Sequence, residues 1–169
     1  MTASSKKTYY RTEREMYPDV IDWFRNLLSS RFPRSEVTVF DTSRVLLRQF
    51  IKRQGLQQHF PDHLFYEIQV DITGIVKSSP KILLAFVECK LNAVNLRDVS
   101  QLLGYSRVAR PSISVILSPK SCSRSISYLI ETFGRTDVLQ YDTNRRIRIA
   151  KWDTIKKDGS CVASLRQER

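Results

Sequence analysis

Apolar residues recur every three or four positions over residues 16–28, which is the spacing of an amphipathic helix. Thr12 precedes this run and Glu15 follows three residues later, the pattern of a capping box. In that motif each of the two side chains accepts a hydrogen bond from the backbone N–H of the other residue. The pattern therefore predicts a first helix over residues 13–30.

Other stretches show the patterns of strands. Residues 36–41 alternate between apolar and polar positions, and residues 64–76 do so more strictly, which predicts a strand with one exposed face. Residues 82–90 are apolar at almost every position until their end, as in a central strand covered on both faces. The same criteria predict helices over residues 43–54, 95–109 (with Asn95 as N-cap) and 124–133, and strands over residues 112–117, 137–140 and 146–150.

The order of these elements predicts an α/β fold with one central mixed sheet of four to five strands, flanked by helices. The chain has 169 residues, of which 41% are hydrophobic and 27% charged, as expected for one compact domain. We expect that domain to span residues 12–169, after a flexible basic segment at residues 1–11.

The cysteines and the apolar stretches indicate in which cellular environment the protein is expected. The three cysteines have no CxxC spacing and no secretory signal precedes them, which predicts a reducing, cytoplasmic environment. The longest apolar stretch, residues 82–87, is far shorter than the ~20 residues of a membrane span. Because of this short length, no membrane partner is expected. The sequence also has no glycine-rich phosphate-binding loop, so no nucleotide cofactor is expected.

The charge of the chain points to a polyanionic partner. Twenty-eight Lys and Arg against 17 Asp and Glu give a net charge of +11. These basic residues are spread along the whole sequence, which favours a basic face of the folded domain over a basic tail. Nucleic acid is the usual partner of such a surface, whereas the alternative is a basic surface that only faces solvent.

One pair of predicted strands brings acidic side chains together. A short turn over residues 77–81 joins them, and in the simplest hairpin register the numbers of paired residues sum to 159. Asp71 then faces Glu88, and Lys90 projects from the same face because strand side chains alternate. Two facing carboxylates repel each other unless a cation lies between them. The simpler alternative is an ion pair between Lys90 and one of the acids at the end of the hairpin.

The spacing from Asp71 to residues 88–90, Glu-Cys-Lys, resembles the motif of the PD-(D/E)xK nuclease superfamily. The predicted helix that follows contains Gln101 and Tyr105, similar to the QxxxY motif of RecB-like members. Val70 stands where the proline of the superfamily motif would be. The resemblance covers residues 12–118 and implies a restriction-endonuclease-like core with the element order αβββαβ.

Carboxylates are hard oxygen ligands suited to Mg²⁺ or Mn²⁺. On this basis Asp71 and Glu88 are the expected metal ligands, and the resemblance implies the backbone carbonyl of Cys89 as a third. Lys90 would hold the attacking water or help to deprotonate it, and would neutralise charge in the transition state.

Glu13 and Glu15 open the first helix in a way similar to archaeal Holliday junction resolvases. The capping argument assigns Glu15 to the backbone and leaves Glu13 as an outer catalytic and metal ligand, although the two could exchange roles. The alternative for Glu13 is a solvated acid at a helix N-terminus.

Arg97, Gln101 and Tyr105 are spaced four residues apart, which predicts one stripe on the helix after Lys90. Gln101 is expected to bind phosphate oxygens or to support Lys90, and Tyr105 to contact DNA unless its ring packs into the core. Arg97, Arg107 and Arg110 are candidate contacts to DNA phosphates.

The sequence therefore predicts a Mg²⁺- or Mn²⁺-dependent endonuclease that hydrolyses DNA phosphodiester bonds. The first alternative is a DNA-binding module of the same fold that does not cut, and the second is an adaptor whose basic face binds acidic protein surfaces. A homodimer is plausible for a junction-cutting or double-strand-cutting enzyme. The sequence does not specify whether the substrate is a duplex, a flap, a single strand or a junction.

Overall fold

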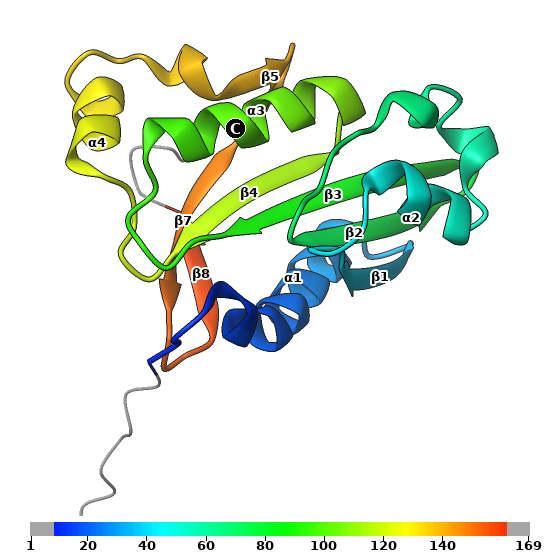
Figure 1. The fold of residues 1–169 in the computed structure, drawn as a ribbon, viewed down its shortest axis with the longest axis horizontal. Helices are drawn as coiled ribbons and strands as arrows, with labels where there is room; N and C mark the ends of the chain where they lie inside the picture. Colours follow the sequence, from blue (N-terminus) through cyan, green and yellow to red (C-terminus); the bar gives the residue numbers. More distant parts are fainter. Residues whose placement is uncertain (1–8, 162–169) are drawn as a thin grey trace, which may run out of the picture.

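The computed structural model describes residues 9–161, and its centre is one six-stranded sheet (Figure 1). The predicted flexible segment over residues 1–11 lies largely outside the described residues, as do residues 162–169 at the end of the predicted domain. The strands of the sheet, in spatial order, are β1 (Glu36–Asp41), β2 (Ile72–Ser78), β3 (Lys81–Cys89), β4 (Ile113–Ser118), β7 (Arg148–Asp153) and β8 (Asp158–Cys161).

The remaining elements surround this sheet. A separate two-stranded ribbon contains β5 (Gln140–Asp142) and β6 (Arg145–Arg146). The α-helices are α1 (Tyr17–Arg31), α2 (Leu47–Arg53), α3 (Leu96–Ala109) and α4 (Arg124–Glu131). Short 3₁₀ helices lie at Glu13–Met16, Gln57–His59, His63–Phe65 and Thr136–Leu139.

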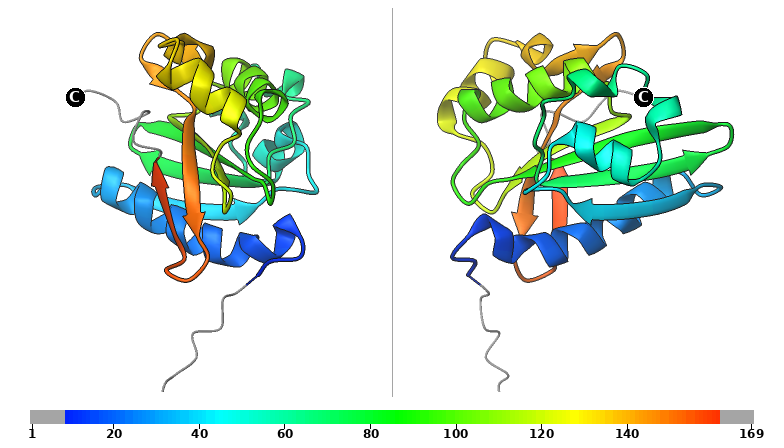
Figure 2. Two further views of the ribbon diagram at one scale, coloured as in Figure 1. Left: turned by 90° about the vertical axis from the view of Figure 1, so that its left-hand side faces the viewer. Right: turned by 45° about the vertical axis from the view of Figure 1, so that its right-hand side comes forward.

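The helices form a layer on each face of the sheet (Figure 2). Helix α1 packs on one face, where Phe24 and Leu28 are fully buried, and helices α2, α3 and α4 pack on the other. Strand β4 is buried at every position and β3 at all but its first three, because both strands are covered from both sides. The predicted central strand is therefore confirmed.

The pairing of the strands defines a mixed sheet. Strands β1, β2 and β3 pair antiparallel, β3, β4 and β7 pair parallel, and β8 returns antiparallel to β7. In the β2–β3 hairpin Ile72 pairs with Val87, which is the predicted register. The α/β class and the flanked mixed sheet are confirmed, with six strands in place of four to five.

The predicted half-exposed strand over residues 64–76 is wrong in extent and in exposure. Tyr66, Ile68 and Val70 are buried, as the alternation indicates, but their segment lies outside the sheet and its carbonyls accept from the first N–H groups of α2. Strand β2 begins at Ile72 and its first five residues are buried, on both faces, so Thr73 lies in the interior. Its hydroxyl is hydrogen-bonded to Thr42 at 2.8 Å, which makes that burial tolerable.

The first helix starts differently from the predicted capping box. Residues Glu13–Met16 form a 3₁₀ turn before α1, and the Thr12 side chain makes no capping hydrogen bond. Glu15 instead accepts from the backbone N–H of Arg11 at 2.7 Å. Pro18, at the second position of α1, needs no N–H partner there, which favours a new helical start at this point.

The cap of α3 agrees with the sequence. Asn95 Oδ1 accepts from the N–H of Asp98 at 3.2 Å, and Asp98 Oδ2 accepts from the N–H of Asn95 at 3.0 Å. These two bonds form a capping box and fix the start of α3 directly after the end of β3. No helix in residues 9–161 is both long and apolar enough to cross a bilayer.

The helix expected over residues 43–54 and the late strands differ from expectation in their bounds. Helix α2 is shorter, starting at Leu47, because Leu46 is extended. Residues 137–140 are mostly a 3₁₀ turn, and the strand expected at residues 146–150 is β7, which runs on to Asp153. Strand β8 was not predicted because its sequence, DGSC, has no apolar alternation.

Candidate active site

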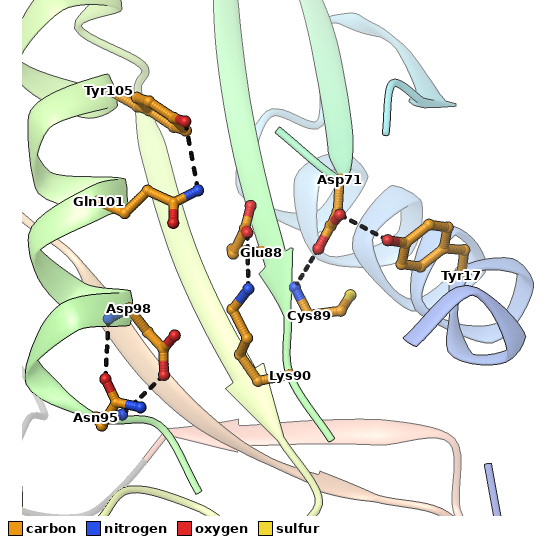
Figure 3. Close-up of polar contacts among 9 residues, drawn as sticks. All are labelled: Tyr17, Asp71, Glu88, Cys89, Lys90, Asn95, Asp98, Gln101 and Tyr105. Atoms are coloured by element: carbon orange, nitrogen blue, oxygen red, sulfur yellow. Dashed lines mark hydrogen bonds and ion pairs between the residues drawn. The ribbon is translucent and has the colours of Figure 1, made fainter. Parts of the chain in front are cut away.

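A buried carboxylate marks the carboxyl end of β3. Glu88 is 6% exposed, and the ammonium group of Lys90 donates to its Oε1 at 3.0 Å (Figure 3). Both side chains lie on the α3 face of β3, as strand alternation predicts. The other oxygen, Oε2, has no hydrogen-bond partner and is alone in this among the buried side-chain polar atoms of residues 9–161. An unsatisfied buried oxygen is costly, so this atom calls for a ligand.

Asp71 lies beside this pair, one residue before β2. Its Oδ2 accepts from the backbone N–H of Cys89 at 2.9 Å, and its Oδ1 accepts from the Tyr17 hydroxyl at 2.6 Å. Figure 3 shows the Asp71 carboxylate between Tyr17 of α1 and the end of β3, with Glu88 and Lys90 on the other side. The hairpin register brings the two acids to the same strand end, but Asp71 turns toward α1 and is not part of the β2–β3 ladder.

The charges of these groups influence one another strongly. Burial raises the pKa of Glu88 to about 7, the negative charge of Asp71 adds to the shift, and Lys90 and, more weakly, the backbone N–H of Asp71 oppose it. Burial alone would lower the pKa of Lys90, but the nearby carboxylates, Glu88 first and then Glu13 and Asp71, raise it above its ordinary value. Lys90 therefore carries its proton at neutral pH, which suits holding a water or neutralising charge better than removing a proton.

Of the two glutamates before α1, only Glu13 lies near this cluster. Burial raises its pKa, Lys90 lowers it, Asp71 raises it again, and the backbone N–H of Leu91 lowers it. Glu15 is exposed and bound to the backbone of Arg11. Glu13 is therefore the glutamate nearer to Asp71 and Lys90, although Glu15 binds the N–H of Arg11 and not that of Thr12 as the predicted capping box requires.

Helix α3 covers the open side of the cluster with polar side chains. Gln101 Nε2 donates to the Tyr105 hydroxyl at 3.3 Å, and Figure 3 shows both side chains directed from α3 toward Glu88 and Lys90. Tyr105 also packs against the core, so its ring is partly buried while its hydroxyl is presented to the site. Asp98 lies on the same side of the helix.

The predicted arginines are only partly brought to this place. Arg97 is exposed in the first turn of α3, at the site end of the helix. Arg107 lies about 15 Å further along the helix axis, because each residue adds 1.5 Å. There it donates to the carbonyl of Gln140 at 3.4 Å, and Arg110 is the C-cap of the helix. The structure therefore does not bring Arg107 and Arg110 to the candidate site.

Sequence reasoning missed Tyr17. It is the residue that holds Asp71 from α1, and burial followed by the hydrogen bond to Asp71 raises its pKa, so the hydroxyl remains a donor. Tyr17 lies four residues after Glu13, one helical turn away. That spacing was the available signal, because it places two polar groups on one side of the same helix start.

The oxygen donors of the cluster are few for a divalent metal. Within residues 9–161 no group of three or more His, Cys, Asp or Glu side chains is close enough to hold one. Mg²⁺, however, is commonly held by one or two carboxylates, with waters completing its shell. Asp71 and Glu88 are two carboxylates of that kind, although both oxygens of Asp71 already accept from protein donors. The Cys89 thiol is buried on the α1 face, so only the backbone carbonyl of that residue could take part.

The comparisons with known proteins add a distant structural likeness. No family model matches the sequence, and no curated protein matches it. Among solved structures, the chain is similar to the MspJI restriction endonuclease in complex with a 27-mer oligonucleotide, with 13% sequence identity and a TM-score of 0.39. The likeness covers 72% of this chain and 24% of that one, so the chain spans about a quarter of that protein's length. It is too distant to carry a functional inference.

The fold class rests on the topology itself. Apart from α2, which is inserted between β1 and β2, the order α1, β1, β2, β3, α3, β4 is the predicted αβββαβ order. Strands β7 and β8 extend this core on the β4 side. Glu88 and Lys90 lie at the end of its third strand and Asp71 at the start of its second.

Proposed function

We propose that this protein is a Mg²⁺- or Mn²⁺-dependent deoxyribonuclease that hydrolyses DNA phosphodiester bonds at the Asp71, Glu88 and Lys90 cluster. The observation that carries the proposal is the buried Glu88 carboxylate, one oxygen of which is bound to Lys90 while the other has no partner in the described part of the chain. A fold rarely keeps such a group unless a ligand satisfies it.

The proposed roles follow from the contacts of each side chain. Asp71 and Glu88 would hold the ion, which supplies a water of lowered pKa and positive charge for the phosphate oxygens. Tyr17 and the Cys89 N–H keep the Asp71 carboxylate in place. Lys90 carries its positive charge beside Glu88 and offsets the negative charge that develops on the phosphate.

The remaining polar groups bind and orient. Gln101 and Tyr105 present an amide and a hydroxyl from α3 to phosphate oxygens, and Arg97 lies exposed at the same end of that helix. Glu13, whose carboxylate is close enough to Lys90 and Asp71 to be influenced by their charges, would be an outer acid of the metal site. The net charge of +11 favours a DNA partner through the release of counterions from its phosphates.

A second candidate function is a DNA-binding module that does not cut. The observation that favours it is the engagement of both Asp71 oxygens by protein donors, since a carboxylate held in this way needs no metal for its hydrogen bonds. In that case the ion pair of Lys90 and Glu88 is only a structural feature of the strand end.

Cleavage assays test the first candidate. Plasmid and branched DNA are incubated with Mg²⁺ or Mn²⁺, and cutting is expected to stop in EDTA. Glu88→Ala and Lys90→Ala are expected to lower the rate by about 10²-fold or more, the typical effect of removing a group that stabilises the transition state, while DNA binding is retained. Glu131→Ala and Lys52→Ala, which remove exposed charges elsewhere, are the matched controls. Full activity in both site variants would refute the assignment.

Metal-dependent stability separates the two candidates without an activity assay. A ligand that binds only the native state raises the melting temperature by mass action. Mg²⁺ is therefore expected to raise the melting temperature of the native chain and to have little effect on Glu88→Gln, which keeps the shape of the side chain but removes its charge. No response in the native chain, together with no cleavage, would favour the non-cutting module.

A further inference from the structure

A second group of basic side chains lines a cavity at the other end of the sheet. The cavity, of about 210 Å³, lies where the C-terminal end of α1, the start of β4 and the β6–β7 segment meet. None of the described residues that line it is acidic. Its charged and polar lining includes Arg31, Arg145, Arg146, Arg148, Ser112 and Asn144.

The arginines of this cavity are largely without counterions. Arg31, Arg146 and Arg148 form no ion pair with any residue of the described range 9–161. Arg145 donates to the backbone carbonyls of Arg110 and Pro111, at 3.1 and 3.3 Å, and approaches Asp142 only at 3.8 Å. Backbone contacts therefore orient one guanidinium, and the like charges of the group repel one another unless an anion joins them.

Buried neighbours define the walls of the cavity. Tyr141 is 7% exposed and its hydroxyl donates to the carbonyl of Pro111. Burial raises its pKa to about 12, the positive charges of Arg145 and Arg148 act against that shift, and the negative charge of Asp142 adds to it. Arg148 is itself half-buried, so the site is recessed and not a flat basic surface.

The volume of the cavity limits the size of the ligand that it can hold. Pockets for organic ligands have volumes of roughly 300 to 1,000 Å³, so this one suits a smaller group. The planar guanidinium fork binds phosphate oxygens in pairs, which makes arginine the preferred residue for that anion. We propose that the cavity lined by Arg31, Arg145, Arg146 and Arg148 binds a phosphate group.

This phosphate site is separate from the candidate active site. Ile113, at the start of β4, pairs with Ala85, whereas Leu117 pairs with Cys89 at the other end of the same ladder. Ile113 and Leu117 are four positions apart, which corresponds to about 13 Å along the strand. Arg148 also lies on the α1 face of the sheet, opposite to Glu88. The proposal therefore does not depend on the proposed nuclease activity.

Calorimetric titration of the full chain with inorganic phosphate, at ionic strength held constant with chloride, tests the site. Saturable binding is expected, and Arg31→Gln and Arg148→Gln are each expected to weaken it about tenfold, the effect of one lost charge-assisted hydrogen bond. Arg53→Gln, which removes an exposed charge from α2, is the matched control. Equal affinity in all four proteins, or binding that does not saturate, would overturn the proposal.

Two further measurements exclude trivial causes. Arg31 is exposed at the end of α1, so its variant is expected to fold normally even if Arg148→Gln does not, and thermal melts check both. Glu88→Gln is expected to keep its full phosphate affinity, so that a failure of the phosphate site and a failure of the nuclease assignment are distinguishable.

A single-stranded oligonucleotide then identifies the source of the phosphate. If the site takes a nucleic-acid backbone, each arginine variant lowers the slope of log K against log salt by about 0.7 per lost contact. If the slope is unchanged while affinity for inorganic phosphate falls, the ligand is a free phosphate, which equally supports the site. If neither the slope nor the phosphate affinity changes, the site does not exist.

Discussion

A single hydroxyl connects the first helix to the candidate catalytic carboxylate. Tyr17 and the Cys89 N–H occupy different oxygens of Asp71, so the direction of that carboxylate is set by two donors from two elements. The pairing of Glu88 with Lys90 could be predicted from sequence because strand alternation is regular, whereas the direction of Asp71 could not, because that residue lies outside the β2–β3 ladder. Tyr17 could not be assigned, because its role depends on how α1 packs against the end of β3.

Tyr17→Phe is therefore expected to act through Asp71. The loss of one buried hydrogen bond lowers the free energy of unfolding by about 1 kcal/mol. The less constrained carboxylate should also raise the Mg²⁺ concentration needed for half-maximal cleavage by several-fold, whereas a purely structural role would leave that concentration unchanged.

Tyr66→Phe provides the matched control for this experiment. Tyr66 donates to Asp62 at 2.7 Å, a bond of the same kind in a part of the fold without candidate site residues. It should lose similar stability and keep the metal dependence of the native chain. An equal shift of metal dependence in both variants would contradict the positioning role of Tyr17.

Local sequence signals predicted most helices and strands correctly. They failed where contacts between distant residues determine the structure of a segment. The Asn95 N-cap of α3, the strand over residues 36–41 and the apolar strand β3 were all predicted, since each depends on residues near in sequence. The segment before β2 was assigned to the sheet because its alternation is that of a strand. Its carbonyls bond to α2 instead, a long-range choice that no periodicity contains. Strand β8 forms only because β7 offers an edge.

The contact of α1 with β2 depends on one glycine. A Cβ at Gly74 would lie 2.6 Å from Leu28 Cδ1 and 3.3 Å from Phe24 Cε1, and both of those side chains are fully buried. Gly74→Ala is expected to cost about 1–3 kcal/mol, because the helix or its side chains must shift. Chemical denaturation measures the loss.

Gly104→Ala is the opposite case within α3. A Cβ there meets nothing within 4 Å, and alanine is favoured over glycine inside a helix by about 0.5–1 kcal/mol. The two substitutions should therefore change stability with opposite signs. A loss of similar size at both positions would show that Gly74 is not specially constrained.

At the scale of the whole molecule, an ion pair joins the two ends of the described chain. Lys157, in the turn between β7 and β8, donates to Asp19 Oδ2 of α1 and to the Tyr10 hydroxyl, both at 2.7 Å. Burial alone would raise the pKa of Asp19, but the hydrogen bonds from Lys157 and Tyr10 outweigh it and lower the pKa below its ordinary 3.8. The carboxylate form is thus favoured by folding.

This network gives a pH-dependent contribution to stability. Because the pKa of Asp19 is lower in the folded chain, the contribution is present above its ordinary pKa of 3.8 and is lost as the pH falls through the lower folded value. Asp19→Asn is expected to lower stability by about 1 kcal/mol at pH 7, a modest value because the pair is one-third exposed. The difference from the native chain should disappear in strong acid, as measured by denaturation at several pH values. A difference that persists there would exclude Asp19 ionisation as its cause.

The contact between Lys157 and Asp19 joins two residues that are synthesised at very different times. Helix α1, which contains the Tyr17 that binds Asp71, leaves the ribosome early. Lys157, which binds Asp19 of this helix, is synthesised more than a hundred residues later. A nascent chain that ends before Lys157 therefore already contains Asp71 and Glu88, but it lacks the ion pair that helps to hold α1. Under the proposed function, the helix that aligns Asp71 would gain this last contact only after Lys157 has been synthesised.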